Sequence, residues 1–194
     1  MATTSAKYPT SDVSSTLINA GGLAWGTTGN AGSSNDTRSS ALLAGGSAPT
    51  ATRALYCSGF GFTSADVPVG STIDGITVTI ERSKQGVGAA TSTIADYSVR
   101  LVNGSAAVAG DDKKDTVTGW PATNDSTANY GGAADDWNAS LTQADVVDTD
   151  FGVAISANIT VGPANVQAAI DSVTVTIDYT EAAASGMKVI ATFL

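Results

Sequence analysis

The chain has 194 residues, a length that fits one domain, and 42% of them are apolar while only 6% are aromatic. Its 18 acidic and 9 basic residues leave a net charge of −9, and Lys113-Lys114 is the longest basic cluster. This balance argues against nucleic acid as a partner, because phosphate binding needs clustered Lys and Arg. Without a secretory signal or an apolar run long enough to cross a bilayer, we expect no membrane partner and synthesis in the cytosol.

Residues 1–52 are predicted to form an extended N-terminal arm with one or two short strands. Ser, Thr, Ala, Gly and Asn dominate this stretch, and its large apolar residues are widely spaced. Isolated apolar anchors suit docking on another surface, so Trp25, Leu42 and Leu43 are candidate partner-binding residues.

Residues 53–180 carry the period-two alternation of half-buried β-strands. Ile76, Val78 and Ile80 share one face of the segment 73–81, and the same pattern recurs in segments 97–102, 151–156 and 173–179. In segment 97–102, Tyr97, Val99 and Leu101 are expected to share a face. Segments 74–80 and 171–177 have similar sequences, which two strands in similar environments would explain.

Helical signals are nearly absent from the chain. The best lies in segment 140–146, where Thr142 is positioned to cap a single turn. The long polar stretch from Gly110 to Ser140 is predicted to be a structured loop or several short strands. Many short alternating strands with Gly-rich turns predict an all-β, antiparallel β-sandwich, jelly-roll-like or alternatively immunoglobulin-like.

Residues 181–194 form a small-residue linker followed by an apolar segment. So apolar a segment is not expected to remain in water: it either pairs with the chain's own sheet or adds a strand to a neighbouring subunit. Its candidate partner-binding residues are Met187, Val189, Ile190, Phe193 and Leu194.

Catalytic chemistry is not expected. The chain has no histidine, which removes the commonest general base and the commonest transition-metal ligand. Carboxylates remain as candidates for glycoside hydrolysis, but they are typical of solvated loops: Asp111, Asp112, Asp135, Asp136, Asp145, Asp148 and Asp150. Four of them, Asp135, Asp136, Asp145 and Asp148, are also candidates for calcium binding, but they match no calcium-loop spacing. We predict no enzyme activity and no cofactor, and we expect the single cysteine, Cys57, to be a buried small hydrophobe.

Three aromatic residues in polar surroundings have two interpretations. Trp120, Tyr130 and Trp137 could stack on sugar rings as a glycan-binding platform. The favoured interpretation is that they fill the end of a sandwich whose other core residues are small.

Residues 20–180 contain a series of short motifs in a specific order and spacing. They are Trp25-Gly26, Asn30-Ala31, Gly59-Phe60-Gly61-Phe62, Val67-Pro68, Ile73-Asp74-Gly75-Ile76, Asp96, Val99-Arg100-Leu101, Trp120-Pro121, Tyr130-Gly131-Gly132, Asp136-Trp137, Leu141-Thr142-Gln143-Ala144-Asp145, Phe151-Gly152-Val153 and Ile170-Asp171-Ser172-Val173. In this order the chain resembles a group of small β-sandwich structural proteins of tailed bacteriophages. It departs from them at Asn138, where glycine is expected.

The resemblance implies a structural virion protein without enzymatic residues. The expected function is a capsid decoration or cement protein on the virion surface, bound to major capsid protein and to sister subunits. A homo-oligomer is expected, and a trimer would fit the three-fold sites of an icosahedral shell. The alternatives are a neck or tail structural protein and a carbohydrate-binding adhesin.

Overall fold

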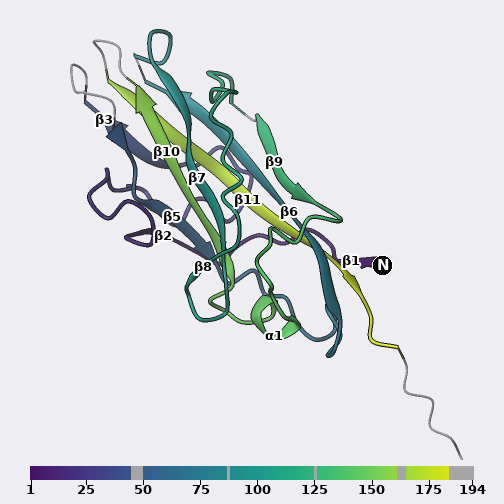
Figure 1. Ribbon diagram of the computed structural model, residues 1–194. Coiled ribbons are helices and arrows are strands. Elements are labelled where there is room, and N and C mark those ends of the chain that lie inside the picture. Colours follow the sequence, from purple (N-terminus) through teal and green to yellow (C-terminus); the bar gives the residue numbers. More distant parts are fainter. Residues whose placement is uncertain (45–49, 87, 125, 161–164, 184–194) are drawn as a thin grey trace, which may run out of the picture.

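Two antiparallel sheets form a β-sandwich in the computed structural model, which describes residues 1–44, 50–86, 88–124, 126–160 and 165–183 (Figure 1). Sheet A has the order β1-β11-β6-β9, with β3 also beside β11. Its strands are β1 (Ala2–Thr3), β3 (Ser39–Leu43), β6 (Thr72–Gln85), β9 (Thr127–Gly132) and β11 (Val166–Thr180). Sheet B has the order β2-β5-β10-β7-β8, with β4 also beside β10. Its strands are β2 (Ser11–Ser15), β4 (Thr50–Ala51), β5 (Ala54–Ser58), β7 (Thr93–Val102), β8 (Val108–Ala109) and β10 (Gly152–Thr160). The predicted antiparallel β-sandwich is confirmed.

The central strands bury the faces that the alternation predicted. Ile76 and Val78 of β6 are fully buried and lie opposite Ile177 and Val175 of β11. Each such side chain stabilises the fold by about 1.5–3 kcal/mol through loss of water contact. The two similar segments, 74–80 and 171–177, are therefore neighbouring strands on one core, and their shared pattern reflects a shared environment.

A β-bulge in β7 corrects one predicted face. Ser98 lies opposite Ser156 of β10, but Asp96 lies opposite the next residue, Ala157, so Tyr97 is an extra residue on β7. The alternation slips there, and Tyr97 is 43% exposed while Val99 is fully buried. The prediction that Tyr97 and Val99 share a face is wrong because period-two reasoning assumes an unbroken ladder.

The N-terminal residues are not an arm, which corrects the predicted division at residue 52. Ala2–Thr3, then Lys7, then Ala31 and finally β3 form backbone hydrogen bonds with β11, from Tyr179 back to Val166. In sheet B, β2 pairs with β5 and β4 pairs with β10. The backbone N–H and C=O groups of a long central strand need hydrogen-bond partners. The N-terminal residues supply these partners from their own backbone, so they can do so although most of them are small. Figure 1 shows β1 beside the end of β11.

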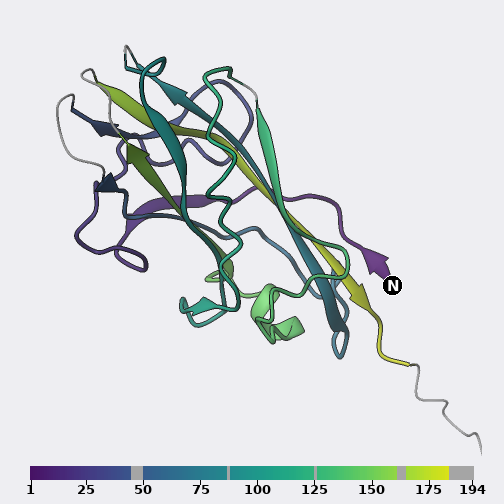
Figure 2. The ribbon, with the colours of Figure 1, turned by 45° about the horizontal axis from the view of Figure 1, so that its top comes forward.

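The segment from β8 to β9 covers the other side of the sandwich. The Trp120 N–H donates to Ile94 O of sheet B at 2.7 Å, and the carbonyl of Pro121 accepts from Lys84 N of sheet A at 2.7 Å. The chain therefore crosses between the sheets at Trp120-Pro121. Figure 2 shows this stretch running along the molecule before it enters β9. Of the two predicted alternatives for residues 110–140, a structured loop or several short strands, the structure agrees best with the first: the described stretch is a hydrogen-bonded loop that leads into β9.

A single helix, α1 (Gln143–Val146), is present in the described residues. The Thr142 hydroxyl accepts from Asp145 N at 3.2 Å, and the Asp145 carboxylate accepts from Thr142 N at 2.9 Å, so the predicted cap is confirmed as a capping box. No described helix is long and apolar enough to cross a membrane.

Candidate functional site

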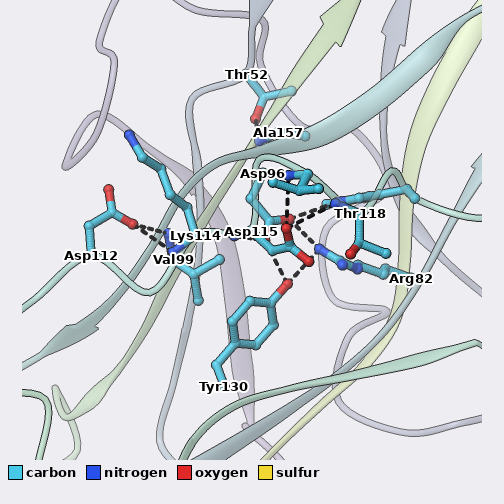
Figure 3. A network of polar contacts seen from close by, with 12 residues as sticks. Thr52, Arg82, Asp96, Val99, Asp112, Lys114, Asp115, Thr118, Tyr130 and Ala157 are labelled. Carbon is cyan, nitrogen blue, oxygen red and sulfur yellow. Dashed lines mark hydrogen bonds and ion pairs between the residues drawn. The ribbon is translucent and has the colours of Figure 1, made fainter.

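A buried polar network joins the two sheets around Asp96 of β7. Its carboxylate accepts from Trp120 Nε1 at 2.7 Å, from Tyr130 Oη at 2.7 Å and from Asp115 N at 2.9 Å, and it forms an ion pair with Arg82 of β6. Figure 3 shows Arg82, Tyr130 and Asp115 gathered around it. The Arg82 guanidinium carbon lies 5.3 Å from the Trp120 ring centre and 5.6 Å from that of Tyr130.

The network has the properties of a structural cross-link. Arg82 and Asp96 are 5% and 2% exposed, so substrate has no access to them. Burial and then the Asp96 carboxylate raise the pKa of Tyr130 far above its usual value, which keeps the phenol protonated as a donor. Removing one partner of such a buried ion pair strongly destabilises the folded protein, because the other charge is left buried without compensation.

The glycan-stacking interpretation is wrong for the three aromatic residues it named. Trp120, Tyr130 and Trp137 are 2%, 5% and 0% exposed, and all belong to the core. Trp137 Nε1 also donates to Ile76 O at 2.8 Å. The favoured interpretation, that these rings fill the sandwich, agrees with the structure. Asn138, where the resemblance predicts glycine, adopts a left-handed backbone conformation with a φ of 50°, and Trp137 before it does the same with a φ of 59°.

The loop carboxylates organise turns. Asp112 accepts from Lys114 N at 3.1 Å, Asp135 from Trp137 N at 2.9 Å, and Asp148 from Asp150 N at 2.9 Å. Asp112 also accepts from Val99 N of β7 at 2.9 Å, which joins its loop to sheet B.

Further contacts hold three of the other carboxylates. Asp111 accepts from Asn138 Nδ2 at 2.6 Å, Asp136 from the Asn138 amide at 3.0 Å, and Asp145 caps α1. The Lys113 ammonium, hydrogen-bonded to Asp135, lowers the pKa of that carboxyl. Within the described residues, no group of three or more Asp, Glu or Cys is arranged to hold a metal ion.

Cys57 lies on β5 and is fully buried. Burial, with a smaller effect from the Asp12 carboxylate, raises the pKa of its thiol well above the ordinary value. The thiol is therefore unreactive in the folded protein, and the prediction of a buried small hydrophobe is confirmed.

The predicted partner-binding anchors separate into three groups. Trp25 and Leu43 are 5% and 4% exposed and pack into the chain's own core, so they are not surface anchors. Leu42 is 49% exposed and remains available for contact. Met187, Val189, Ile190, Phe193 and Leu194 lie outside the described residues.

Among the cavities that open on the described surface are a groove on sheet B and a cavity at one end of the sandwich. The sheet-B groove has a volume of about 410 Å³ and is lined by Leu17, Ile18, Tyr97, Ser98, Arg100, Val108, Asp112 and Lys114. The end cavity has a volume of about 340 Å³ and is lined by Ser71, Thr72, Ile73, Asp136, Ser140, Leu141 and Thr142. Sequence reasoning missed both, because each brings together residues that are far apart in the sequence. The bulge that turns Tyr97 outward has no signal in the alternation.

Comparisons of the chain with models of known protein families, with curated proteins and with solved structures give no match.

Proposed function

We propose that this chain is a structural virion protein of a tailed phage, a capsid decoration or cement protein that stabilises the head. The observation that carries the proposal is how the described polar groups are used. The buried Asp96 network joins the sheets, and the loop carboxylates hold turns. Such a domain acts through its surfaces, which is what a cement protein needs.

Two sequence features support the same function. The ordered motifs of residues 20–180 resemble small sandwich proteins of tailed phages, and the segment 187–194 is apolar except for Lys188 and Thr192. An acidic chain with few charged residues suits packing against other protein subunits more than binding nucleic acid. Leu42, which is 49% exposed on β3, is a further candidate contact.

A binding assay with phage heads tests the proposal. Heads of a tailed phage that encodes the chain, prepared without it, are mixed with the full chain or with a chain lacking residues 187–194, and the pellet is analysed after sedimentation. We expect the full chain to bind at fixed stoichiometry and the truncated chain to remain in the supernatant. Equal occupancy would remove the attachment role of the segment.

Electron microscopy of labelled virions separates the head from the neck and tail. Label distributed over the head supports the decoration role. Label confined to the neck or tail contradicts it and assigns the chain to the alternative structural role there.

A further inference from the structure

We infer that the apolar segment Met187–Leu194 of one copy binds the end cavity of a second copy, so that the chain self-associates through its C-terminal segment. The end cavity lies where the described chain leaves β11. Thr180 pairs with Thr72 of β6, and Thr72 in turn forms a bridge with Thr142. Ala182 lies against Gly70, 3.3 Å from where a Cβ on that glycine would be.

The surface around the end cavity is incompletely covered by the described residues. Val69 is 76% exposed. Leu141 and Ile73 supply apolar walls to the cavity, and the Ser71 hydroxyl is buried without a hydrogen-bond partner. A buried hydroxyl without a partner costs free energy, and an exposed apolar side chain beside a cavity favours an apolar occupant. A segment that binds the end cavity therefore needs apolar side chains for its walls and polar backbone groups for the Ser71 hydroxyl.

Segment 187–194 has these properties and also matches the cavity in charge. Lys188 is its one charged side chain. Asp136 lines the cavity and forms no ion pair within the described residues, since its carboxylate accepts only from Asn138 N. An ammonium beside Asp136 would complete the charge pairing at the cavity rim.

The strand arrangement favours a second copy as the source of the segment. β11 is paired on both sides at Tyr179, with Ala2 on one side and Ile73 on the other. A strand folding back from residue 183 therefore finds no free edge along the end of β11. β6 also lies between β11 and Thr142. The described chain therefore ends with no free edge of its own sheet beside it, and a second copy is the source that this arrangement favours.

Cysteine cross-linking between two differently sized chains tests the inference without any phage component. One chain carries Ser140→Cys, a one-atom change at the cavity, and the other, with a size tag, carries Phe193→Cys. The native Cys57 is fully buried and does not compete. The matched control replaces Ser140→Cys by Val117→Cys, at a residue that is 92% exposed on another loop. We expect the Ser140 pair to form the mixed disulfide about tenfold faster than the control, as expected for a bound segment with raised effective concentration.

Two results would overturn the inference. One is an equal cross-linking rate for the Ser140 and Val117 pairs. The other is a chain carrying both Ser140→Cys and Phe193→Cys that closes only within itself and runs at monomer mass under non-reducing conditions.

A charge reversal provides a second, independent measurement. Asp136→Lys should weaken self-association about threefold or more in analytical ultracentrifugation, and adding Lys188→Glu should restore it. Asp150→Lys, the same change at another exposed loop carboxylate, should have no effect. A chain that sediments as a monomer, or a double variant that is not rescued, would contradict the assigned contact. Because both measurements use the chain alone, failure to bind phage heads would leave their results unaffected.

Discussion

At Asp96 of sheet B, donors from sheet A meet one buried carboxylate. Arg82 belongs to β6 and Tyr130 to β9, while Asp96 itself belongs to β7 of the opposite sheet. We expect Asp96→Asn to lower the free energy of unfolding by about 3–5 kcal/mol, because it leaves the Arg82 charge buried without its partner. Urea unfolding followed by tryptophan fluorescence measures the change.

The matched control for this substitution is Asp150→Asn at an exposed carboxylate. It should change the free energy of unfolding by no more than about 0.5 kcal/mol. Similar values for the two variants would show that the Asp96 network does not hold the sheets together.

Lys7 and Asp66 form a partly exposed ion pair at 2.7 Å that holds the N-terminal residues to the loop after β5. The Lys7 hydrogen bond is the largest influence on the Asp66 carboxyl, and the pKa is lowered from its ordinary value of 3.8. A carboxyl with a lowered pKa in the folded state stabilises the fold above its unfolded pKa, and this contribution is lost as the pH falls through the folded value.

Asp66→Asn should therefore reduce stability by about 0.5–1 kcal/mol at pH 7. The difference from the unchanged chain should shrink below about pH 4 and then vanish. Thermal or urea unfolding across this pH range measures it. A difference that is constant with pH would show that the charge of Asp66 has no part in the effect.

At the scale of elements, β9 depends on the close approach of Trp137 to its backbone. A Cβ on Gly131 would lie 2.3 Å from Trp137 Nε1 and 2.2 Å from Ile76 O, and Gly131 also has a φ of +71°. We expect Gly131→Ala to destabilise the protein by about 1–3 kcal/mol from backbone strain, with a further loss from displacing the ring. Urea unfolding measures the change, and near-ultraviolet circular dichroism reports on the Trp137 environment.

The neighbouring residue provides the control. A Cβ on Gly132 would meet nothing within 4 Å. Gly132→Ala should leave stability and the near-ultraviolet spectrum close to those of the unchanged chain. Equal losses at the two glycines would indicate that general strand flexibility, not the approach of Trp137, explains the effect.

Elements differed in how well alternation and local signals predicted them. The faces of β6 and β11 and the Thr142 cap depend on residues adjacent in sequence, so their prediction succeeded. The face of Tyr97 depends on a bulge in the β7–β10 ladder, and this is a property of the pairing. The burial of Trp120, Tyr130 and Trp137 likewise depends on Arg82, Asp96 and Ile76, which are distant in sequence.

At the scale of the whole molecule, the N-terminal residues complete sheet A along β11. The Val175 amide donates to Lys7 O at 3.0 Å, and the Ile177 amide donates to Thr4 Oγ1 at 3.0 Å. Deleting residues 1–10 should therefore destabilise the domain and speed hydrogen exchange at the Val175 and Ile177 amides.

Hydrogen exchange contains its own control for this deletion. β6 pairs with the opposite side of β11, so the deletion removes no hydrogen bond from residues 76–80. The exchange rates of their amides should therefore change only as far as the global stability changes. If the deletion leaves exchange at Val175 and Ile177 unchanged, the N-terminal residues do not protect β11.

Sequence alone determined the fold class, the inward faces of β6 and β11, the buried state of Cys57 and the turn Gln143–Val146 that Thr142 caps. These depend on side-chain periodicity and local hydrogen bonding, which neighbouring residues specify. Only the tertiary structure decided that Trp25 and Leu43 are core residues and that segments within residues 1–43 pair with β11 and β5. It also decided that three aromatic rings are buried and that an acidic-rimmed cavity lies where β11 ends. Each of these depends on which distant backbone edges and side chains come together, and the period of a strand carries no information about its partner.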